Sequence, residues 1–209
     1  CVVPLTFGSS TRFASGCRCV WPNSPISWAM RIVGGKHAGR HLTSPAKRIR
    51  PTPENVRDRW LGRLKDDLDG ARVLDLFAGS GALGLEALSR GASSVDFVEN
   101  GAEALHSLKA NVAALREKKR SRIFKRDAIV FAEALGEHCY DITFVDAPYR
   151  SKKLDRIIKT WAACHFTRIL GVEHARDHVL PNGQLRGRTR LRGETGVTIF
   201  RASIVEGLR

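Results

Sequence analysis

Acidic residues are scarce in this 209-residue chain. Asp and Glu number 21 against 35 Lys and Arg, so the formal net charge at pH 7 is +14. Such a shortage is unusual for an enzyme of small neutral metabolites. It favours a polyanionic partner such as nucleic acid over generic surface basicity.

Long apolar runs and patterned cysteines are also missing. No apolar stretch approaches the roughly 20 residues that span a bilayer, so we expect no membrane partner. The five cysteines are odd in number and form no spaced ligand set with histidines, which predicts a reducing compartment, no structural zinc and no metal site. We therefore expect a cytoplasmic protein, or one of an organelle stroma or matrix if the N-terminal segment is a targeting sequence.

Residues 1–29 show little helical or strand periodicity and carry only two charges, Arg12 and Arg18. A lack of acids is typical of organelle transit peptides, but Arg is sparse here and the first residue is Cys1. We expect an unstructured extension or a sequence artefact, with Met30 as the natural start.

Residues 30–52 contain no acidic residue and form a basic arm. Val33 is expected to open a short strand before Gly34–Gly35, while Pro45 and Pro51 disfavour a long helix. A solvated tail is the alternative, but a basic run at the edge of a folded domain suits a phosphate backbone. The basic side chains of the arm are Arg31, Lys36, Arg40, Lys47, Arg48 and Arg50.

The rest of the chain, residues 53–209, is long enough for one sizeable core. A first helix is expected from Pro53 to Leu68, with Arg57 largely off its apolar face. Strand-like and helix-like segments then alternate, which predicts an α/β fold with a doubly wound, mostly parallel sheet. The expected strands are 72–77, 94–98, 122–125, 141–145, 168–172 and 197–204, and the expected helices are 82–90, 102–115, 128–135 and 151–163.

A glycine loop joins the first expected strand to its helix. Gly79, Gly81 and Gly84 complete a GxGxxG pattern, and Glu99 follows about 20 residues later, as in dinucleotide enzymes. Asp75 separates two interpretations, because a carboxylate inside an apolar strand would repel a pyrophosphate. It suits the amino group of S-adenosylmethionine instead, so a methyltransferase is favoured over a dehydrogenase.

Two further acids follow neighbouring strands. Glu99 is expected to bind ribose hydroxyls, and the alternative is a solvent-exposed charge at a strand end. Asp127, followed by Ala128, is expected to accept a hydrogen bond from an adenine amine or to cap the next helix, and both roles could coexist.

The sequence Asp146-Ala147-Pro148-Tyr149 directly follows the apolar run Ile142–Val145. A carboxylate and an aromatic ring at the end of a buried strand suit chemistry on the exocyclic amine of a flat base, since one binds the N–H groups and the other holds the base in plane. A simple turn is the alternative.

Four segments together resemble the RsmD family of class I S-adenosylmethionine-dependent methyltransferases. They are Met30–Gly35, Arg50–Thr52 with Arg57, Leu76–Ala92 and Gly193–Thr195. The resemblance covers about Met30 to Arg201 and implies a seven-stranded, Rossmann-like methyltransferase domain over residues 53–209. It also implies methylation of a guanine N2 amine in small-subunit ribosomal RNA, on naked RNA or on the ribosomal particle. Because a single domain with one active site requires no partner subunit, we expect a monomer.

The residue patterns and the resemblance together predict three groups of site residues. The catalytic group is Asp146, Ala147, Pro148 and Tyr149. The cofactor group is Asp75, Phe77, Ala78, Gly79, Ser80, Gly81, Glu99, Asn100, Asp127 and Ala128. The RNA-binding group is Arg31, Lys36, Arg40, Lys47, Arg48, Arg50 and Arg57.

Ala147 departs from the family pattern, which has a proline there. Alanine still supplies the backbone carbonyl that can accept an amine proton, so we expect activity to survive with less loop stiffness. Three alternatives stay open: another amine target such as adenine or protein glutamine, a catalytically weakened RNA-binding homologue, and a dehydrogenase. The basic run Arg186–Arg192 is either a second RNA contact or a solvated hairpin.

Overall fold

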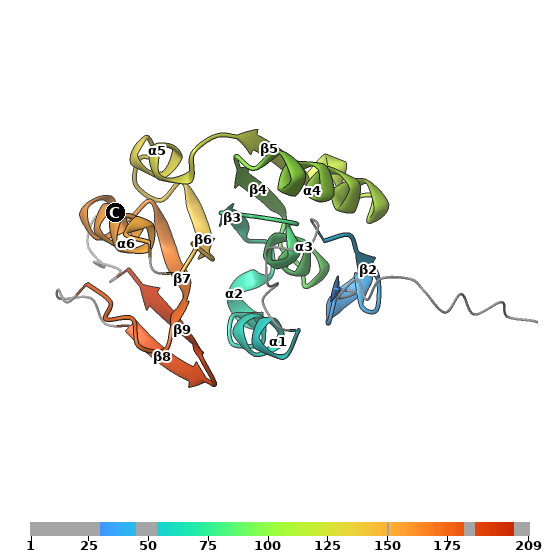
Figure 1. The fold of residues 1–209 in the computed structure, drawn as a ribbon. Helices are drawn as coiled ribbons and strands as arrows, with labels where there is room; N and C mark the ends of the chain where they lie inside the picture. Colours follow the sequence, from blue (N-terminus) through green and yellow to red (C-terminus); the bar gives the residue numbers. More distant parts are fainter. Residues whose placement is uncertain (1–29, 45–53, 150, 182–186, 203–209) are drawn as a thin grey trace, which may run out of the picture.

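The computed structural model describes residues 30–44, 54–149, 151–181 and 187–202. Its main feature is a seven-stranded sheet in the order β5-β4-β3-β6-β7-β9-β8 (Figure 1). The first five strands of that order run parallel, and β9 is antiparallel to both β7 and β8. The predicted α/β fold with a mostly parallel, Rossmann-like sheet is confirmed.

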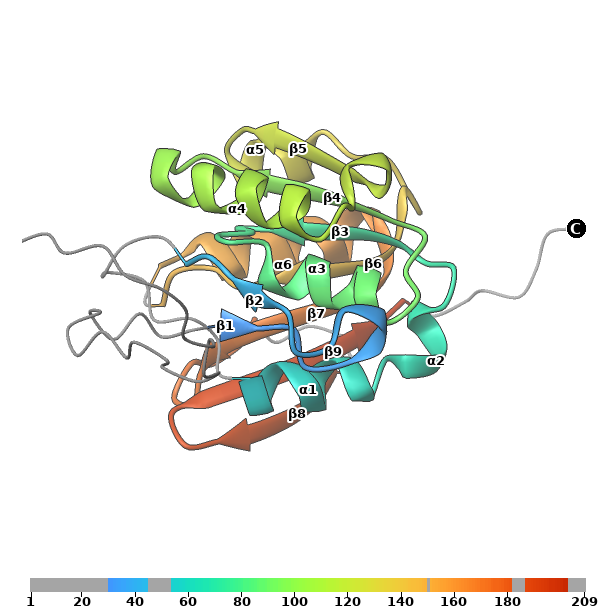
Figure 2. The same cartoon turned by 90° about the vertical axis from the view of Figure 1, so that its right-hand side faces the viewer.

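Helices cover both faces of this sheet (Figures 1 and 2). The strands are β3 (Arg72–Leu76), β4 (Ser94–Glu99), β5 (Ser121–Lys125), β6 (Tyr140–Val145), β7 (Thr167–Ala175), β8 (Gly187–Arg192) and β9 (Thr195–Arg201). On one face lie α1 (Glu54–Gly62), α3 (Ala82–Ser89) and α4 (Ala102–Ala114), and on the other lie α5 (Ala128–Glu133) and α6 (Lys153–Cys164). In the described residues, no helix is both long enough and apolar enough to cross a membrane.

The central strands are almost wholly apolar because both of their faces are buried. Each face contributes one hydrophobic cluster, and Trp60 of α1 meets Phe144 of β6 edge to face, with ring centroids 5.3 Å apart. Gly171 of β7 makes room for this indole, since a Cβ at that position would lie 2.7 Å from its Nε1. These contacts hold α1 on the sheet.

The first helix differs from the expectation. It ends at Gly62, because glycine is unfavourable in the interior of a helix, and a separate short helix α2 (Lys65–Leu68) follows. The start expected at Pro53 lies outside the described residues. Leu64 and Leu68 are nevertheless fully buried, so the predicted apolar face docks on the core as expected.

Two strands also differ from their expected places. The N-terminal hairpin consists of β1 (Met30–Arg31) and β2 (His41–Leu42), so Val33 does not open a strand. Its N–H instead donates to the Glu86 carboxylate at 2.9 Å. The basic run near the C-terminus contains β8, which pairs with β9, so a hairpin is present there.

A buried carboxylate attaches this hairpin to α3. Glu86 is 0% exposed and accepts the backbone N–H of Gly34 at 2.7 Å and the guanidinium of Arg90 at 2.9 Å. Arg57 is also 0% exposed, with its guanidinium 3.7 Å from Glu86 and hydrogen-bonded to the Arg31 carbonyl at 2.9 Å. Gly35 must be glycine, because φ is +77° and a Cβ would lie 1.8 Å from the Ser89 carbonyl oxygen.

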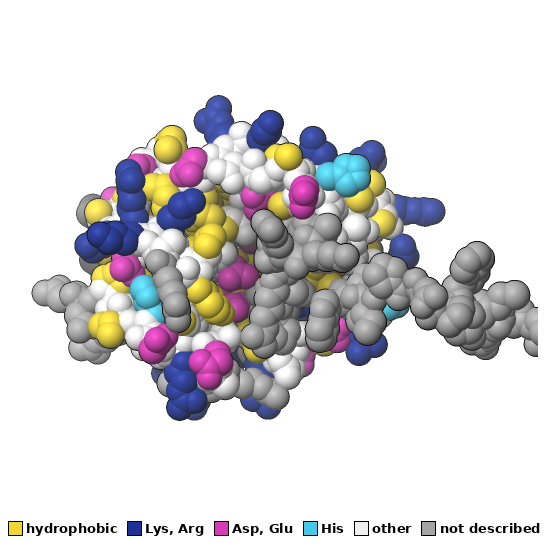
Figure 3. Space-filling model, in the orientation of Figure 1, with side chains coloured by type: hydrophobic (Ala, Val, Ile, Leu, Met, Phe, Trp, Pro, Cys, Tyr) yellow, Lys and Arg dark blue, Asp and Glu magenta, His cyan; other side chains and the backbone are white. Residues whose placement is uncertain are grey.

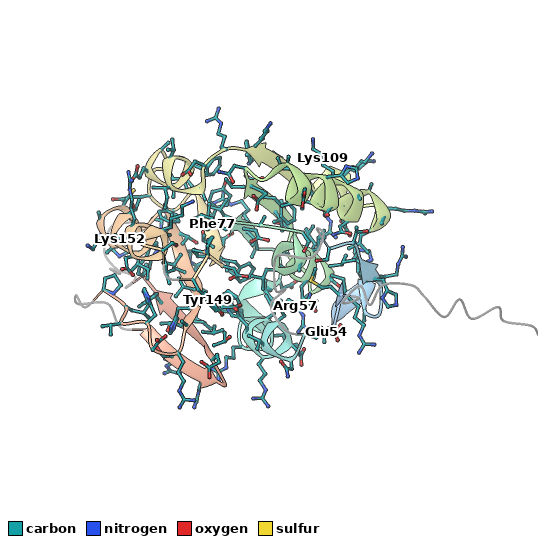
Figure 4. The ribbon with its side chains drawn as sticks, in the orientation of Figure 1. Glu54, Arg57, Phe77, Lys109, Tyr149 and Lys152 are labelled. Carbon is teal, nitrogen blue, oxygen red and sulfur yellow. The ribbon has the colours of Figure 1, made fainter. Side chains whose placement is uncertain are left out.

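The burial of Arg57 corrects its expected position off the apolar face (Figure 4). Burial lowers the pKa of this guanidinium, and the Glu86 charge opposes that shift. An arginine inside the protein cannot contact a phosphate backbone, so Arg57 connects α1 to the hairpin instead of extending the basic surface.

A second buried acid, Glu117, binds side chains of the loop between β1 and β2. Glu117 accepts from Lys36 at 2.7 Å, from His37 at 2.6 Å and from Arg120 at 2.7 Å. Burial raises the pKa of Glu117, but the hydrogen bonds from Arg120, His37 and Lys36 outweigh burial and lower it to about 2.

Replacement of Glu117 by Gln should therefore weaken the fold and change its acid sensitivity. The pKa of Glu117 falls from 4.5 to about 2 on folding, so its contribution is present above pH 4.5 and is lost as the pH falls toward 2. We expect Glu117→Gln to lower the free energy of unfolding by about 1–3 kcal/mol at pH 7 and by much less near pH 2.

Denaturant unfolding at about pH 7, 5, 3 and 2 measures this effect. Glu133→Gln is the matched control, because Glu133 pairs with Arg156 on the surface and such pairs contribute only about 0–1 kcal/mol. Equal pH dependence in the wild type and Glu117→Gln would contradict the assignment.

Candidate cofactor and acceptor site

The predicted site residues follow four adjacent parallel strands. Asp75 lies within β3, Glu99 ends β4, Asp127 follows β5 and Asp146 follows β6. Since these strands run parallel, their carboxyl ends meet at one edge of the sheet, and the chain order changes direction there between β3 and β6. The structure thus brings the four predicted acids to one edge.

Asp75 is buried, with 1% of its surface exposed, and accepts the backbone N–H of Gly84 at 2.9 Å. Burial raises the pKa of this carboxyl well above its usual range, the Gly84 hydrogen bond lowers it, and the charges of Asp146 and Glu99 raise it again. Asp75, Asp146 and Glu99 thus lie close enough to act on one another, and a cationic ligand beside them would favour the ionised form of Asp75.

The glycine loop has an unusual backbone. Phe77, Gly79 and Gly81 have φ of 60°, 56° and 81°, and the first of these is costly for a residue with a side chain, by about 1–3 kcal/mol. A Cβ on Gly81 would lie 2.4 Å from Leu108 of α4, so the loop can pass under that helix only as glycine. Phe77, labelled in Figure 4, packs against the hydrophobic cluster on the α5/α6 face of the sheet, with the Lys153 ammonium 5.8 Å from its ring centroid.

Glu99 is not a freely solvated charge. Its carboxylate is half-buried and accepts three backbone N–H groups, from Gly79 at 2.8 Å, Asn100 at 2.8 Å and Gly101 at 2.7 Å. This carboxylate therefore joins the glycine loop to the start of α4.

Asp127 caps α5, so the capping alternative is confirmed. Its Oδ1 accepts from Ile129 at 2.8 Å and from Val130 at 3.2 Å, while Ala128 is buried beside it. Both bonds end on one oxygen, so the cap does not engage Oδ2. A role toward an adenine amine stays a prediction.

The segment after β6 presents one polar and one aromatic group. Asp146 is half-buried, Ala147 is buried and Tyr149 is 47% exposed. The Tyr149 hydroxyl donates to Glu173 Oε1 at 3.0 Å and lies 3.2 Å from Thr195 Oγ1. Burial and the Glu173 charge raise the pKa of this phenol and the Thr195 hydrogen bond lowers it, and the net effect keeps it neutral.

Three residues near this edge were not identified from the sequence. Glu173 and Thr195 contact Tyr149, and Glu173 also lines the hollow beside Tyr149 together with Ala147 and His178. The available signals were an acid that ends an apolar strand and the Gly193–Thr195 segment, to which the sequence assigned no role.

The third residue is Asn111 of α4, which is 1% exposed. Its amide donates to the Ser80 carbonyl at 2.9 Å and to the Thr43 carbonyl at 2.8 Å, and it accepts the Thr43 N–H at 2.7 Å. Asn111 thereby links the glycine loop to the segment after β2. A polar residue on the apolar face of an expected helix was the signal for it.

The basic candidates have several different environments. Arg31 pairs with Glu54 at 3.0 Å, Lys36 pairs with Glu117, and Arg40 donates to the Ala114 carbonyl at 3.1 Å, while all three side chains stay exposed. Lys47, Arg48 and Arg50 lie outside the described residues. Lys and Arg side chains surround the face seen in Figure 3, and several acidic side chains lie near its middle.

Comparisons with known proteins agree with this geometry. The family described as Conserved hypothetical protein 95 matches residues 30–200. The chain is 34% identical to the Putative rRNA methyltransferase YlbH of Bacillus subtilis, over 82% of this chain and 98% of the relative. It is 38% identical to the Ribosomal RNA small subunit methyltransferase D of Escherichia coli K12, over 66% of this chain and 69% of the relative.

Solved structures give the same result. The Putative methyltransferase yhhF from Escherichia coli superposes with a TM-score of 0.73 and 31% identity, over 82% of this chain and 97% of that protein. A hypothetical protein of Thermus thermophilus superposes with a TM-score of 0.71 and 31% identity, over 83% of this chain and 99% of that protein. The chain therefore belongs to the RsmD/YlbH family of ribosomal RNA methyltransferases, with the class I S-adenosylmethionine-dependent methyltransferase fold.

Proposed function

We propose that this protein transfers a methyl group from S-adenosyl-L-methionine to the exocyclic N2 amine of a guanine in small-subunit ribosomal RNA. The observation that carries the proposal is the position of Asp146 and Tyr149 directly after β6, beside the buried carboxyl of Asp75. The name of the Escherichia coli relative specifies small-subunit RNA and supports the choice of acceptor. One site on one compact domain requires no second subunit, so we propose that the protein acts as a monomer.

The residues at the strand ends fit this cofactor. A cationic amino group beside the buried Asp75 carboxyl would favour its ionised form and would donate a charge-assisted hydrogen bond to it. Glu99 lies where ribose hydroxyls would compete for its oxygens, and Asp127 retains an oxygen for an adenine amine. The residues that would hold the cofactor are Asp75, Phe77, Ala78, Gly79, Ser80, Gly81, Glu99, Asn100, Asp127 and Ala128.

When bound, the cofactor supplies an electrophilic methyl group, so the protein has mainly to align the acceptor. Asp146 would accept a hydrogen bond from the guanine amine and stabilise the positive charge that develops on it. The base would be extruded from its RNA context at a cost of a few kcal/mol, and stacking on Tyr149 would return about 1–3 kcal/mol.

Ala147 and Pro148 complete the catalytic group. The Ala147 backbone carbonyl can accept a hydrogen bond from the second N–H of the guanine amine. The buried position of this residue keeps water from competing for that hydrogen bond. Pro148 restricts the loop that leads to Tyr149, because its ring fixes φ near −65°. The substitution of alanine for the family's proline thus removes stiffness but no hydrogen-bonding group.

We further propose that the basic arm and the β8 hairpin bind the RNA backbone. The arm would contribute Arg31, Lys36, Arg40, Lys47, Arg48 and Arg50, whereas the buried Arg57 is no longer included. Arg188 and Arg190 are exposed and alternate along β8, so both lie on one side of that strand. The turn after β8 leads to Thr195, which contacts Tyr149, so this hairpin would bring RNA close to the acceptor site.

Asp146→Ala should strongly slow methyl transfer while it leaves the cofactor affinity within about twofold of wild type. We expect a loss of about 10²–10³-fold in kcat, since the variant removes the group that aligns and stabilises the amine. A labelled-methyl assay on 30S particles, free ribosomal RNA and DNA, followed by nucleoside analysis, measures the rate and identifies the product.

Asp141→Ala is the matched control, because Asp141 lies near the opposite end of β6 and accepts the Arg72 N–H at 2.8 Å. Calorimetry with S-adenosylmethionine and NAD in parallel tests the cofactor. Label found only on adenine would refute the guanine assignment, and binding of NAD alone would refute the methyltransferase.

Two double variants test the proposed RNA surface. Each arginine that contacts a phosphate contributes about one unit to the slope of log affinity against log salt. We therefore expect Arg48→Ala/Arg50→Ala and Arg188→Ala/Arg190→Ala each to weaken RNA binding and to lower this slope by about two. Filter binding across a salt series measures it.

The control for these variants is Arg156→Ala, whose exposed side chain on α6 pairs with Glu133. It should leave the slope unchanged. An unchanged slope in Arg188→Ala/Arg190→Ala would show that the β8 hairpin is merely solvated.

A further inference from the structure

The phenol of Tyr149 is held by two side chains that are remote from it in sequence. Its hydroxyl donates to Glu173 of β7 at 3.0 Å and lies 3.2 Å from the hydroxyl of Thr195 at the start of β9. We propose that Glu173 and Thr195 are positioning residues that orient the Tyr149 ring as the platform for the target base. This inference rests on the proposed function, because only a methyl acceptor gives the ring a base to hold.

Packing alone does not fix this ring. Tyr149 is 47% exposed, whereas Glu173 is 3% exposed, so the ring is anchored mainly at its hydroxyl end by a group inside the protein. The alignment of a reacting amine is sensitive to small displacements, and a misplacement of about 1 Å can cost on the order of 100-fold in rate. A platform anchored at its far end keeps the base in one plane.

The direction of β9 makes this anchor available. Because β9 is antiparallel to β7, it starts at the same edge of the sheet where β7 ends. Ala175 pairs with Thr195 and Glu173 pairs with Val197, so Glu173 and Thr195 are diagonal neighbours on one face. The hydroxyl and the carboxylate therefore converge on a single point beside the carboxyl end of β6.

A second tyrosine provides a contrast within the same molecule. Tyr140, at the start of β6, also donates to a buried acid, with its hydroxyl 2.6 Å from Asp96 Oδ2. That ring is only 8% exposed and is packed in the core, and Arg122 also hydrogen-bonds to Asp96. The Tyr140 pair therefore stabilises the sheet, while the Tyr149 pair orients an exposed ring.

Tyr149→Phe keeps the ring and removes both anchoring bonds. We expect kcat for methyl transfer to 30S particles to fall about tenfold, while the KM for RNA and the cofactor affinity change less than about twofold. Tyr140→Phe, the matched control, should lower the melting temperature and leave kcat unchanged.

A variant series then tests whether Glu173 acts through the hydroxyl. Glu173→Ala should lower kcat in the wild type but add nothing in the Tyr149→Phe background. Glu173→Gln keeps an acceptor oxygen and should retain activity within about threefold, and Thr195→Val should cause an intermediate loss. Additive losses, or a wild-type kcat in Tyr149→Phe, would overturn the inference. If Glu173→Ala fails to fold, the kcat values of Glu173→Gln and Thr195→Val still test whether these side chains act through the Tyr149 hydroxyl.

A spectroscopic measurement separates this inference from the proposed function. The chain has only two tyrosines, so ¹⁹F NMR of 3-fluorotyrosine-labelled protein should give one signal for each. In Thr195→Val the Tyr149 signal should shift and the Tyr140 signal should not. An unmoved Tyr149 signal would refute the anchor whatever the activity. If the methyl label appears on adenine while Thr195→Val shifts the Tyr149 signal and lowers kcat, the guanine assignment is refuted. The anchoring of Tyr149 by Glu173 and Thr195 then still holds.

Discussion

Parallel pairing of β3 with β4 and β6 is the constraint on which the rest of the site depends. The register places Leu76 opposite Val98 on one side and opposite Val145 on the other, so all three strands end together. Asp75, Glu99 and Asp146 therefore share one edge. Burial and the charges of Asp146 and Glu99 raise the pKa of the Asp75 carboxyl there. This convergence suits the cationic cofactor that we propose, and the basic periphery seen in Figure 3 suits the proposed RNA acceptor.

Buried polar groups attach the N-terminal hairpin to that edge. Glu86 binds the hairpin backbone, and Arg57 and Arg90 compensate its charge in the interior. Asn111 then joins the segment after the hairpin to the carbonyl of Ser80 in the glycine loop. The proposed RNA arm is thus connected to the proposed cofactor loop by Glu86 and Asn111, which belong to neither segment.

Much of this architecture was predictable from local patterns. The apolar strands, the amphipathic α4 and the glycine loop follow from periodicity and from backbone requirements that only glycine meets, as at Gly81. The burial of Arg57 was predictable too, because Arg57 precedes Trp60 by three and Leu61 by four positions and so lies on the apolar face of its helix. The sequence analysis misplaced it, and only its pairing with Glu86 on another helix required the tertiary structure. For the basic run 186–192 the sequence left an RNA contact and a solvated hairpin open, because no apolar pattern marks an edge strand, and the structure shows that β8 forms a hairpin with β9.

The sequence by itself determined the fold class, the family and the four acids at the strand ends, since each depends on residues close together in the chain. Only the tertiary structure decided what surrounds Tyr149. Its partners Glu173 and Thr195 are 24 and 46 residues away, and they reach it because β9 reverses direction beside β7. Local sequence specifies where a strand ends, but the pairing of distant strands decides which side chains meet there.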